Sequence, residues 1–238
     1  KPIEDHSENL VIEPRPEWWD NKIGILPDDQ VPIPWTNLTT NTKGAAETAL
    51  SCWNRTYHYQ DSLLPAQVST AGADMLRRPI QMRAVVAGTD AGTIGTALQI
   101  TKETNARVEL TTTGQLGTIA AQTETWLEYD GFMWVKFTLT PEAPTKLANL
   151  RLEIPIKREY ATLYNSDRED DRAGTGAIDD IGEEFFTRFD QIWNRAVVCW
   201  AGDGARGIHW CTESNQNWSL NAPHRGIGYI RTDDTVTI

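Results

Sequence analysis

Residues 119–140, IAAQTETWLEYDGFMWVKFTLT, decide the fold class of this chain. Two β-rich runs, residues 119–129 and 132–140, flank the dipeptide Asp130-Gly131. That dipeptide between two such runs is typical of a β-hairpin with a two-residue type I′ turn. The stretch therefore predicts a pair of long antiparallel strands.

A two-residue turn also predicts which side chains share a face, because strand side chains alternate with period two. It pairs Leu127 with Trp134 and Trp126 with Val135. One face then holds Leu127, Tyr129, Phe132 and Trp134, and the other holds Trp126, Met133, Val135, Phe137 and Leu139, with Glu128 as its one charge. Both predicted faces are mainly apolar, whereas in a two-layer sandwich one face of each sheet is exposed to solvent and carries polar side chains. We therefore expect the N-terminal segment or a neighbouring domain to cover this hairpin.

The rest of the chain extends the same pattern. Strand-like runs at residues 48–59, 74–86, 96–103, 106–113 and 147–157 are separated by Gly, Pro, Asn and Asp. Short strands without intervening helices predict an all-β fold, an antiparallel two-sheet β-sandwich with few or no helices.

The expected domain organisation is simple. Residues 1–47 are rich in proline and acidic residues and sustain no period, so we expect an extended N-terminal strap packed on the domain. Residues 48–238 are expected to form one β-sandwich domain, which this length allows.

Residues 195–218, RAVVCWAGDGARGIHWCTESNQNW, predict a second hairpin. A turn centred on Ala205 sets Trp200 opposite Trp210 and Cys199 opposite Cys211. Two interpretations of the cysteines are open: a disulfide across the hairpin, or buried free thiols.

The same stretch holds a candidate carbohydrate site. The Arg206 guanidinium can donate two hydrogen bonds to vicinal hydroxyls, Asp203 and Glu213 can accept others, and the Trp218 indole can stack on a sugar ring. The competing interpretation is a core hairpin that ends in a polar loop.

Charge and hydropathy exclude several classes of partner. The formal charge is −11 and the pI is about 4.8, which repels nucleic acid and anionic lipid. The sequence has no apolar run of the ~20 residues that span a bilayer, so membrane insertion is not expected. The first residues, KPIEDHSENL, lack the basic and apolar regions of a signal peptide, and the last strand runs to Ile238, so we expect a processed chain or a piece of a longer protein.

Motifs for catalysis and metal binding are not found. The sequence lacks G-x-S-x-G, H-E-x-x-H and P-loop patterns. A zinc site at His209, Cys211 and His224 lacks a second close pair of ligands, and the acidic loop 165–184 lacks the glycine of an EF-hand. We therefore expect no metal and no cofactor. Glu128 and Glu153 lie in apolar strands, where a salt bridge is a commoner outcome than a raised pKa.

Several runs, in order, resemble one family. They are VPIPWT from Val31, SCWNRTY from Ser51, EYDGFMW from Glu128, LEIPIKREYA from Leu152 and WAGDGARGI from Trp200, followed by Glu213, Ser214 and Trp218. This succession resembles the N-terminal β-sandwich region of large bacterial proteins related to glycoside hydrolase family 123. The resemblance implies a following (β/α)₈ barrel, where an adjacent Asp-Glu pair performs substrate-assisted hydrolysis of N-acetylgalactosaminides. It therefore implies no catalytic residue in this chain.

The resemblance leads to one expected function and two alternatives. We expect a non-catalytic β-sandwich module of a secreted or periplasmic glycoside hydrolase, which supports the C-terminal barrel domain and contributes to binding of a glycan or oligosaccharide. The first alternative is a free-standing carbohydrate-binding module or lectin-like protein. The second is a complete enzyme that uses acids such as Glu128 or Glu213.

Overall fold

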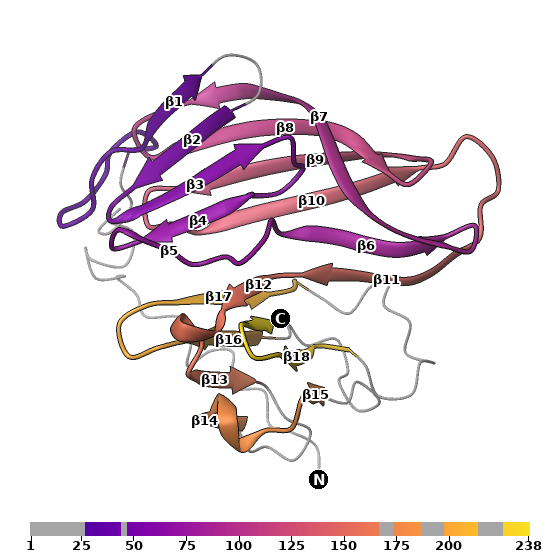
Figure 1. Cartoon of the computed structure of the whole chain (residues 1–238). Helices are drawn as coiled ribbons and strands as arrows, with labels where there is room; N and C mark the ends of the chain where they lie inside the picture. Colours follow the sequence, from indigo (N-terminus) through magenta and orange to yellow (C-terminus); the bar gives the residue numbers. More distant parts are fainter. Residues whose placement is uncertain (1–26, 44–46, 167–173, 187–197, 214–225) are drawn as a thin grey trace, which may run out of the picture.

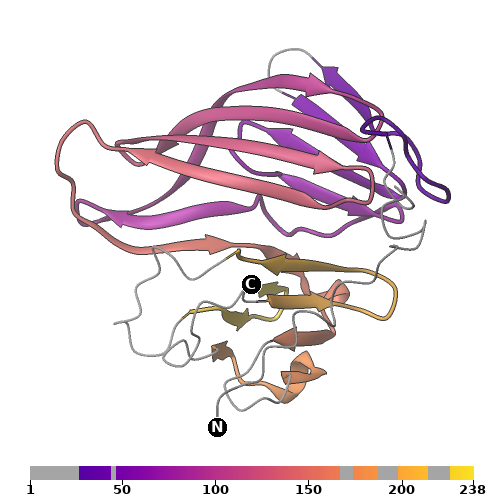
Figure 2. The same ribbon diagram turned by 180° about the vertical axis from the view of Figure 1, so that it is seen from behind.

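The computed structural model describes residues 27–43, 47–166, 174–186, 198–213 and 226–238. Throughout these ranges the chain is built from antiparallel strands, and the helical content is two 3-10 turns, η2 (Arg158–Tyr160) and η3 (Ile178–Asp180). Figures 1 and 2 show two large sheets face to face, with two smaller sheets gathered along one side. The predicted all-β antiparallel sandwich is confirmed, and the two small sheets are an addition to it.

The first layer of the sandwich is a five-stranded sheet in sequence order. Its strands are β1 (Thr39–Lys43), β2 (Glu47–Cys52), β3 (Arg55–Gln60), β4 (Gln67–Thr70) and β5 (Ala73–Asp74). Alternate residues of β2 are buried, as expected for a strand with one face toward the core. The last residues of the predicted strap, 39–43, thus belong to the sheet as β1.

The second layer is a six-stranded sheet in the order β10-β9-β8-β7-β6-β11. Its strands are β6 (Gln81–Val86), β7 (Thr89–Glu103), β8 (Arg107–Leu116), β9 (Ile119–Glu128), β10 (Met133–Thr140) and β11 (Leu147–Glu153). Its inner face buries Val108, Leu110 and Leu127 in one cluster with Leu50 and Tyr59 of the opposite layer. Burial of apolar surface between the layers is the main stabilising contribution here.

Two four-stranded sheets form the smaller part of the molecule. One contains β12 (Pro155–Lys157), β19 (Thr235–Thr237), β18 (Gly228–Arg231) and β15 (Glu184–Phe186); the other contains β14 (Gly174–Ala177), β13 (Leu163–Ser166), β16 (Val198–Gly202) and β17 (Gly207–Cys211). The buried Tyr229 joins them, since its hydroxyl lies 2.6 Å from the Asn165 carbonyl and 3.0 Å from the Trp200 carbonyl. A bridge between Leu76 and Ile156 ties these sheets to the sandwich.

The structure corrects the predicted register of the β9–β10 hairpin. Trp134 lies opposite Trp126, and Met133 lies opposite Leu127. The predicted pairs, Leu127 with Trp134 and Trp126 with Val135, are each wrong by one residue.

The reason is the length of the loop, which has three residues, 129–131, instead of two. The Gly131 N–H donates to the Glu128 carbonyl and the Glu128 N–H donates to the Phe132 carbonyl, both at 2.9 Å. Gly131 has a φ of +88°. A type I turn followed by a left-handed residue is the usual three-residue hairpin loop, and glycine adopts that φ without steric cost.

The corrected register separates apolar from polar side chains. The inner face of the hairpin carries Leu127, Met133, Val135, Phe137 and Leu139, whereas the outer face carries Gln122, Glu124, Trp126, Trp134, Lys136 and Thr138. The prediction that both faces are mainly apolar is therefore wrong. Apart from its two tryptophans, the outer face has the polar alternation of a solvated sheet, so this hairpin does not by itself require a covering domain.

The β16–β17 hairpin also differs by one residue from the prediction. Cys199 lies opposite Trp210, Trp200 opposite His209, and Cys211 opposite Val198. Cys199 is buried and Cys211 is exposed, and all three cysteines of the chain are free thiols. The Cys199–Cys211 disulfide is therefore excluded in this structure.

The described part of the predicted strap contacts two neighbouring loops at one end of the six-stranded sheet, the β7–β8 loop and the β9–β10 loop. The Trp35 ring meets Tyr129 edge to face at 5.8 Å between centroids, and the Leu38 N–H donates to the Asn105 carbonyl at 2.8 Å. Trp18 and Trp19 of the strap lie outside the described residues. The division into a strap and a single domain stays a prediction.

Candidate functional site

The predicted sugar-binding residues Asp203 and Arg206 form the turn between β16 and β17. Asp203 Oδ1 accepts hydrogen bonds from the backbone N–H of Ala205 (2.7 Å) and of Arg206 (2.8 Å). The Asp203 N–H in turn donates to the Arg206 carbonyl at 2.8 Å. A side chain that satisfies the backbone in this way closes a tight turn, which explains why the hairpin centre lies between Gly204 and Ala205.

The two side chains are also mostly covered. Their exposed fractions are 22% for Asp203 and 24% for Arg206, with Arg206 Nε 3.4 Å from Asp203 Oδ2. The guanidinium lies over the Tyr160 ring, 5.1 Å from its centroid, at a distance typical of a cation–π contact. This pair therefore stabilises the turn, and less than a quarter of each side chain is exposed to a ligand.

Glu213 lies beyond the other end of β17. Seven residues separate it from Arg206, or about 23 Å along an extended strand at ~3.3 Å per residue. The structure therefore does not bring Glu213 together with Asp203 and Arg206. Trp218, the fourth predicted residue, lies outside the described residues.

Glu213 instead contacts the outer face of the β9–β10 hairpin. Its Oε1 accepts a hydrogen bond of 2.7 Å from the indole Nε1 of Trp134. Trp134 stacks on Trp126 with 4.1 Å between ring centroids and 13° between ring planes. The Arg107 guanidinium lies 4.8 Å from the centroid of the Trp126 ring. Arg107, Trp126 and Trp134 thus form a row across β8, β9 and β10, which ends at the edge of the sheet.

Ion pairs border this row. Arg107 contacts Glu128 at 2.6 Å and Glu109 at 3.9 Å. Lys136 of β10 contacts Glu124 of β9 at 3.0 Å, at the next cross-strand pair on the same face. These partly exposed pairs each contribute little to stability. Their effect is to hold long side chains beside the indoles.

Phe132 adds a third aromatic ring at the same edge. It immediately precedes β10 and is two residues from Trp134, so it shares the outer face, and it is 47% exposed. We define the hairpin platform as Phe132, Trp134 and Trp126 together with Glu213. Sequence reasoning singled out Glu213 but missed the platform, because the assumed two-residue turn put Trp126 and Trp134 on opposite faces.

The two strand glutamates considered as catalytic acids are both paired. Glu128 contacts Arg107, and Glu153 contacts Arg151 at 2.7 Å and Arg78 at 2.8 Å. These contacts hold each carboxylate against one or more guanidinium groups, as in an ordinary structural salt bridge. The salt-bridge interpretation is confirmed for both residues.

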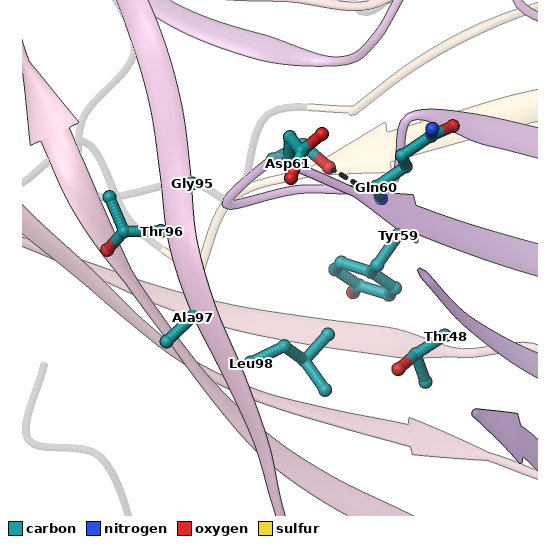
Figure 3. Close-up of a pocket in the computed structure, with 9 residues that line it drawn as sticks. Thr48, Tyr59, Gln60, Asp61, Gly95, Thr96, Ala97 and Leu98 are labelled. Carbon is teal, nitrogen blue, oxygen red and sulfur yellow. Dashed lines mark hydrogen bonds between the residues drawn. The ribbon is translucent and has the colours of Figure 1, made fainter. Parts of the chain in front are cut away.

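A pocket at the end of the sandwich is too small for a sugar ring. Figure 3 shows Thr48, Tyr59 and Leu98 beside it, between the end of β3 and the middle of β7, where Gly95 approaches the loop after Asp61. The Gly95 N–H donates to the Asp61 carbonyl at 3.0 Å. The space is about that of one water molecule.

Metal ligands do not gather in the part of the chain that the structure describes: no group of three or more His, Cys, Asp or Glu side chains is placed to hold an ion there. His224 and the acidic residues Asp167, Glu169 and Asp171 lie outside it. Among the described residues, no helix has the length and apolarity that a membrane crossing needs.

The described residues form an all-β domain with stacked aromatic side chains on the outer face of the β9–β10 hairpin. Comparison with protein families then assigns it. The family model described as "Glycoside hydrolase 123, third domain" matches residues 44–222, about three quarters of the chain. The chain therefore belongs to this domain family, and the predicted relation to glycoside hydrolase family 123 is confirmed. The N-terminal position expected from the resemblance stays a prediction. No curated protein matches the sequence.

Proposed function

We propose that this chain is a non-catalytic β-sandwich module of a secreted or periplasmic bacterial glycoside hydrolase. In this proposal it supports a following (β/α)₈ barrel domain and contributes to glycan binding. The observation that carries the proposal is the match to a family 123 domain over residues 44–222.

The paired acids support a non-catalytic role. Glycosidases use two carboxyl groups that flank the scissile bond, one of them protonated. Glu128 and Glu153 are held by arginines, and Glu213 is bonded to an indole on an open sheet face. Carboxylates that are engaged in this way favour binding of a glycan over its hydrolysis.

We also propose the domain layout of a strap, residues 1–47, packed on a single sandwich domain, residues 48–238, with the end of the strap adding strand β1 to the five-stranded sheet. Its support is the core cluster, which runs without interruption from Leu38 through both large sheets to Tyr229 and Val236 of the small ones. A contiguous core is the mark of one cooperative unit.

The alternative, a free-standing carbohydrate-binding module, is favoured by the exposed aromatic residues of the hairpin platform. Both functions predict glycan affinity for the chain. They differ in the reading frame beyond Ile238: a barrel there favours the module of a larger enzyme, and a stop codon favours the free-standing protein.

The test combines a glycan array with a hydrolysis assay on N-acetylhexosaminides, both on the intact chain. We expect binding without release of free sugar. Turnover that is lost in Glu213→Gln would instead identify a complete enzyme, and the absence of any binding would remove the glycan-binding part of the proposal.

A further inference from the structure

We propose that the hairpin platform is a carbohydrate-binding surface, on which rings of a neutral oligosaccharide pack against Trp134 and Phe132 while Glu213 accepts hydrogen bonds from sugar hydroxyls. This inference rests on the proposed function and locates its glycan site. It replaces the four residues expected from the sequence with a different set that shares only Glu213.

Trp134 lies at the edge of its sheet. One face of its indole stacks on Trp126, and β10 is the terminal strand of its sheet in the described residues. No further strand of that sheet therefore lies against the other face of the indole. Trp134 is half-buried, so its ring is anchored while part of it stays accessible. Sugars bind such rings through the apolar C–H side of the pyranose.

Phe132 lies next to Trp134 along the same strand edge. Two residues on the same face of a strand are separated by about 7 Å, so Phe132 and Trp134 offer two neighbouring rings along one edge. With an exposed fraction of 47%, Phe132 is among the most exposed large apolar side chains in the described residues. Two aromatic contacts in a line fit an extended chain of sugars better than a single small molecule.

Contacts within the chain hold the platform in place without a ligand. The Trp134 indole stacks on the Trp126 ring, which in turn packs against the Arg107 guanidinium. The Trp134 indole N–H also donates a hydrogen bond of 2.7 Å to Glu213. A surface that is already ordered loses less conformational entropy when it binds. A carboxylate has about four acceptor positions, and the Trp134 indole uses one of those of Glu213. The remaining positions can accept from hydroxyls.

Charge selects the type of glycan. Four carboxylates, Glu109, Glu124, Glu128 and Glu213, surround the platform, against three cations, Arg107, Lys136 and Lys102. An excess of carboxylates repels sulfated or uronic-acid polymers. Neutral sugars, including N-acetylated hexosamines, are therefore the expected ligands. The charged side chains beside the platform already have partners within the chain. This favours a neutral sugar over a protein that would bind through ion pairs.

The test is calorimetric titration of the intact chain with two probes, an N-acetylhexosamine disaccharide and a neutral hexose tetrasaccharide. Against whichever probe binds the wild type, we expect Trp134→Ala to weaken affinity by about tenfold or more, since tenfold corresponds to ~1.4 kcal/mol, a normal contribution for one stacked ring. Phe132→Ala and Glu213→Gln should each weaken it about threefold to tenfold.

Two controls separate binding from folding. Ile94→Ala removes a side chain of similar exposure, 55%, on β7, and it should leave the affinity unchanged. Each variant is checked for an unchanged thermal midpoint. If Trp134→Ala does not fold, Phe132→Ala decides the question, because an exposed side chain is removed at little cost in stability.

The outcomes distinguish the inference from the proposed function. If the wild type binds and the platform variants bind equally well, the location is wrong and the glycan-binding module stands. If the variants keep their affinity for sugar but lose self-association or association with another protein, the platform is a protein contact and the inference is wrong. If the wild type binds neither probe, both fail.

Discussion

Substitution of Gly131 by alanine tests how the β9–β10 loop sets the register of the platform. Gly131 has a φ of +88°, a conformation that costs a residue with a Cβ about 1–2 kcal/mol. The new methyl group would also overlap the Arg55 guanidinium and lie 3.2 Å from the Tyr57 hydroxyl oxygen.

Those two neighbours hold the loop against the opposite sheet. The Tyr57 hydroxyl donates to the Gly131 carbonyl at 2.8 Å, and Arg55 donates to the Asp130 carbonyl. Tyr57 is buried and has little room to move. Displacement of one of these donors costs about 1 kcal/mol more. We therefore expect Gly131→Ala to lower the free energy of unfolding by about 2–3 kcal/mol.

Gly88→Ala is the matched control. Gly88 has almost the same φ, +91°, but an added Cβ there meets nothing within 4 Å. It should lose only the conformational part, about 1–2 kcal/mol. Urea unfolding followed by tryptophan fluorescence measures both variants, and the extra loss in Gly131→Ala should lower its thermal midpoint by a further ~2–4 °C. Equal destabilisation of the two variants would refute the reasoning that contacts across the sandwich fix this loop.

Three further predictions concern other groups. Trp126→Phe removes an indole N–H that is buried without a hydrogen-bond partner among the described residues. Relief of the ~1–3 kcal/mol desolvation cost of that N–H should offset the apolar area lost with the smaller ring, so the free energy of unfolding should fall by less than about 1 kcal/mol. A fall of about 3 kcal/mol in a denaturant titration would contradict this. Burial raises the pKa of the Cys199 thiol to about 12. A disulfide reagent at pH 8 should therefore modify the exposed Cys211 quickly and Cys199 only after denaturation. Rapid modification of two or more thiols in the native chain would contradict the burial of the cysteines seen in the structure. Hydrogen bonding from Arg158 lowers the pKa of the Asp179 carboxyl below its ordinary value of 3.8. The stabilising contribution of the Asp179 carboxylate is therefore present above that ordinary pKa and is lost as the pH falls through the lower pKa of the folded state. Asp179→Asn should make stability less dependent on pH in the acid range, and an unchanged dependence there would count against the pairing with Arg158.

The fold class was accessible from sequence because alternation of apolar and polar residues is a local signal. Residues 119–128 and 133–140 alternate clearly, and both form strands, β9 and β10. The two small sheets were not predicted as separate units. Strands such as β15 and β19 have only three residues, too few for a period to be recognised.

The register was not accessible, because it depends on contacts distant in sequence. Asp130-Gly131 fits a two-residue turn when only the hairpin is considered. In the folded chain the Tyr129 N–H donates to the Ala106 carbonyl, and Tyr57 donates to the Gly131 carbonyl. These bonds favour the three-residue loop, and one residue of difference exchanges the two faces of a strand. The location of the candidate site also depends on the register, because Trp126 and Trp134 share a face only in the observed register.

Indole N–H resonances of the uniformly ¹⁵N-labelled chain test the central claim most directly. Addition of a neutral oligosaccharide should shift the Trp134 resonance in a saturable way, with the assignment made from Trp134→Phe. The Trp200 resonance, beside the Asp203–Arg206 turn, should stay in place. A saturable shift of Trp200 with Trp134 unmoved would show that the glycan binds elsewhere and would contradict the account.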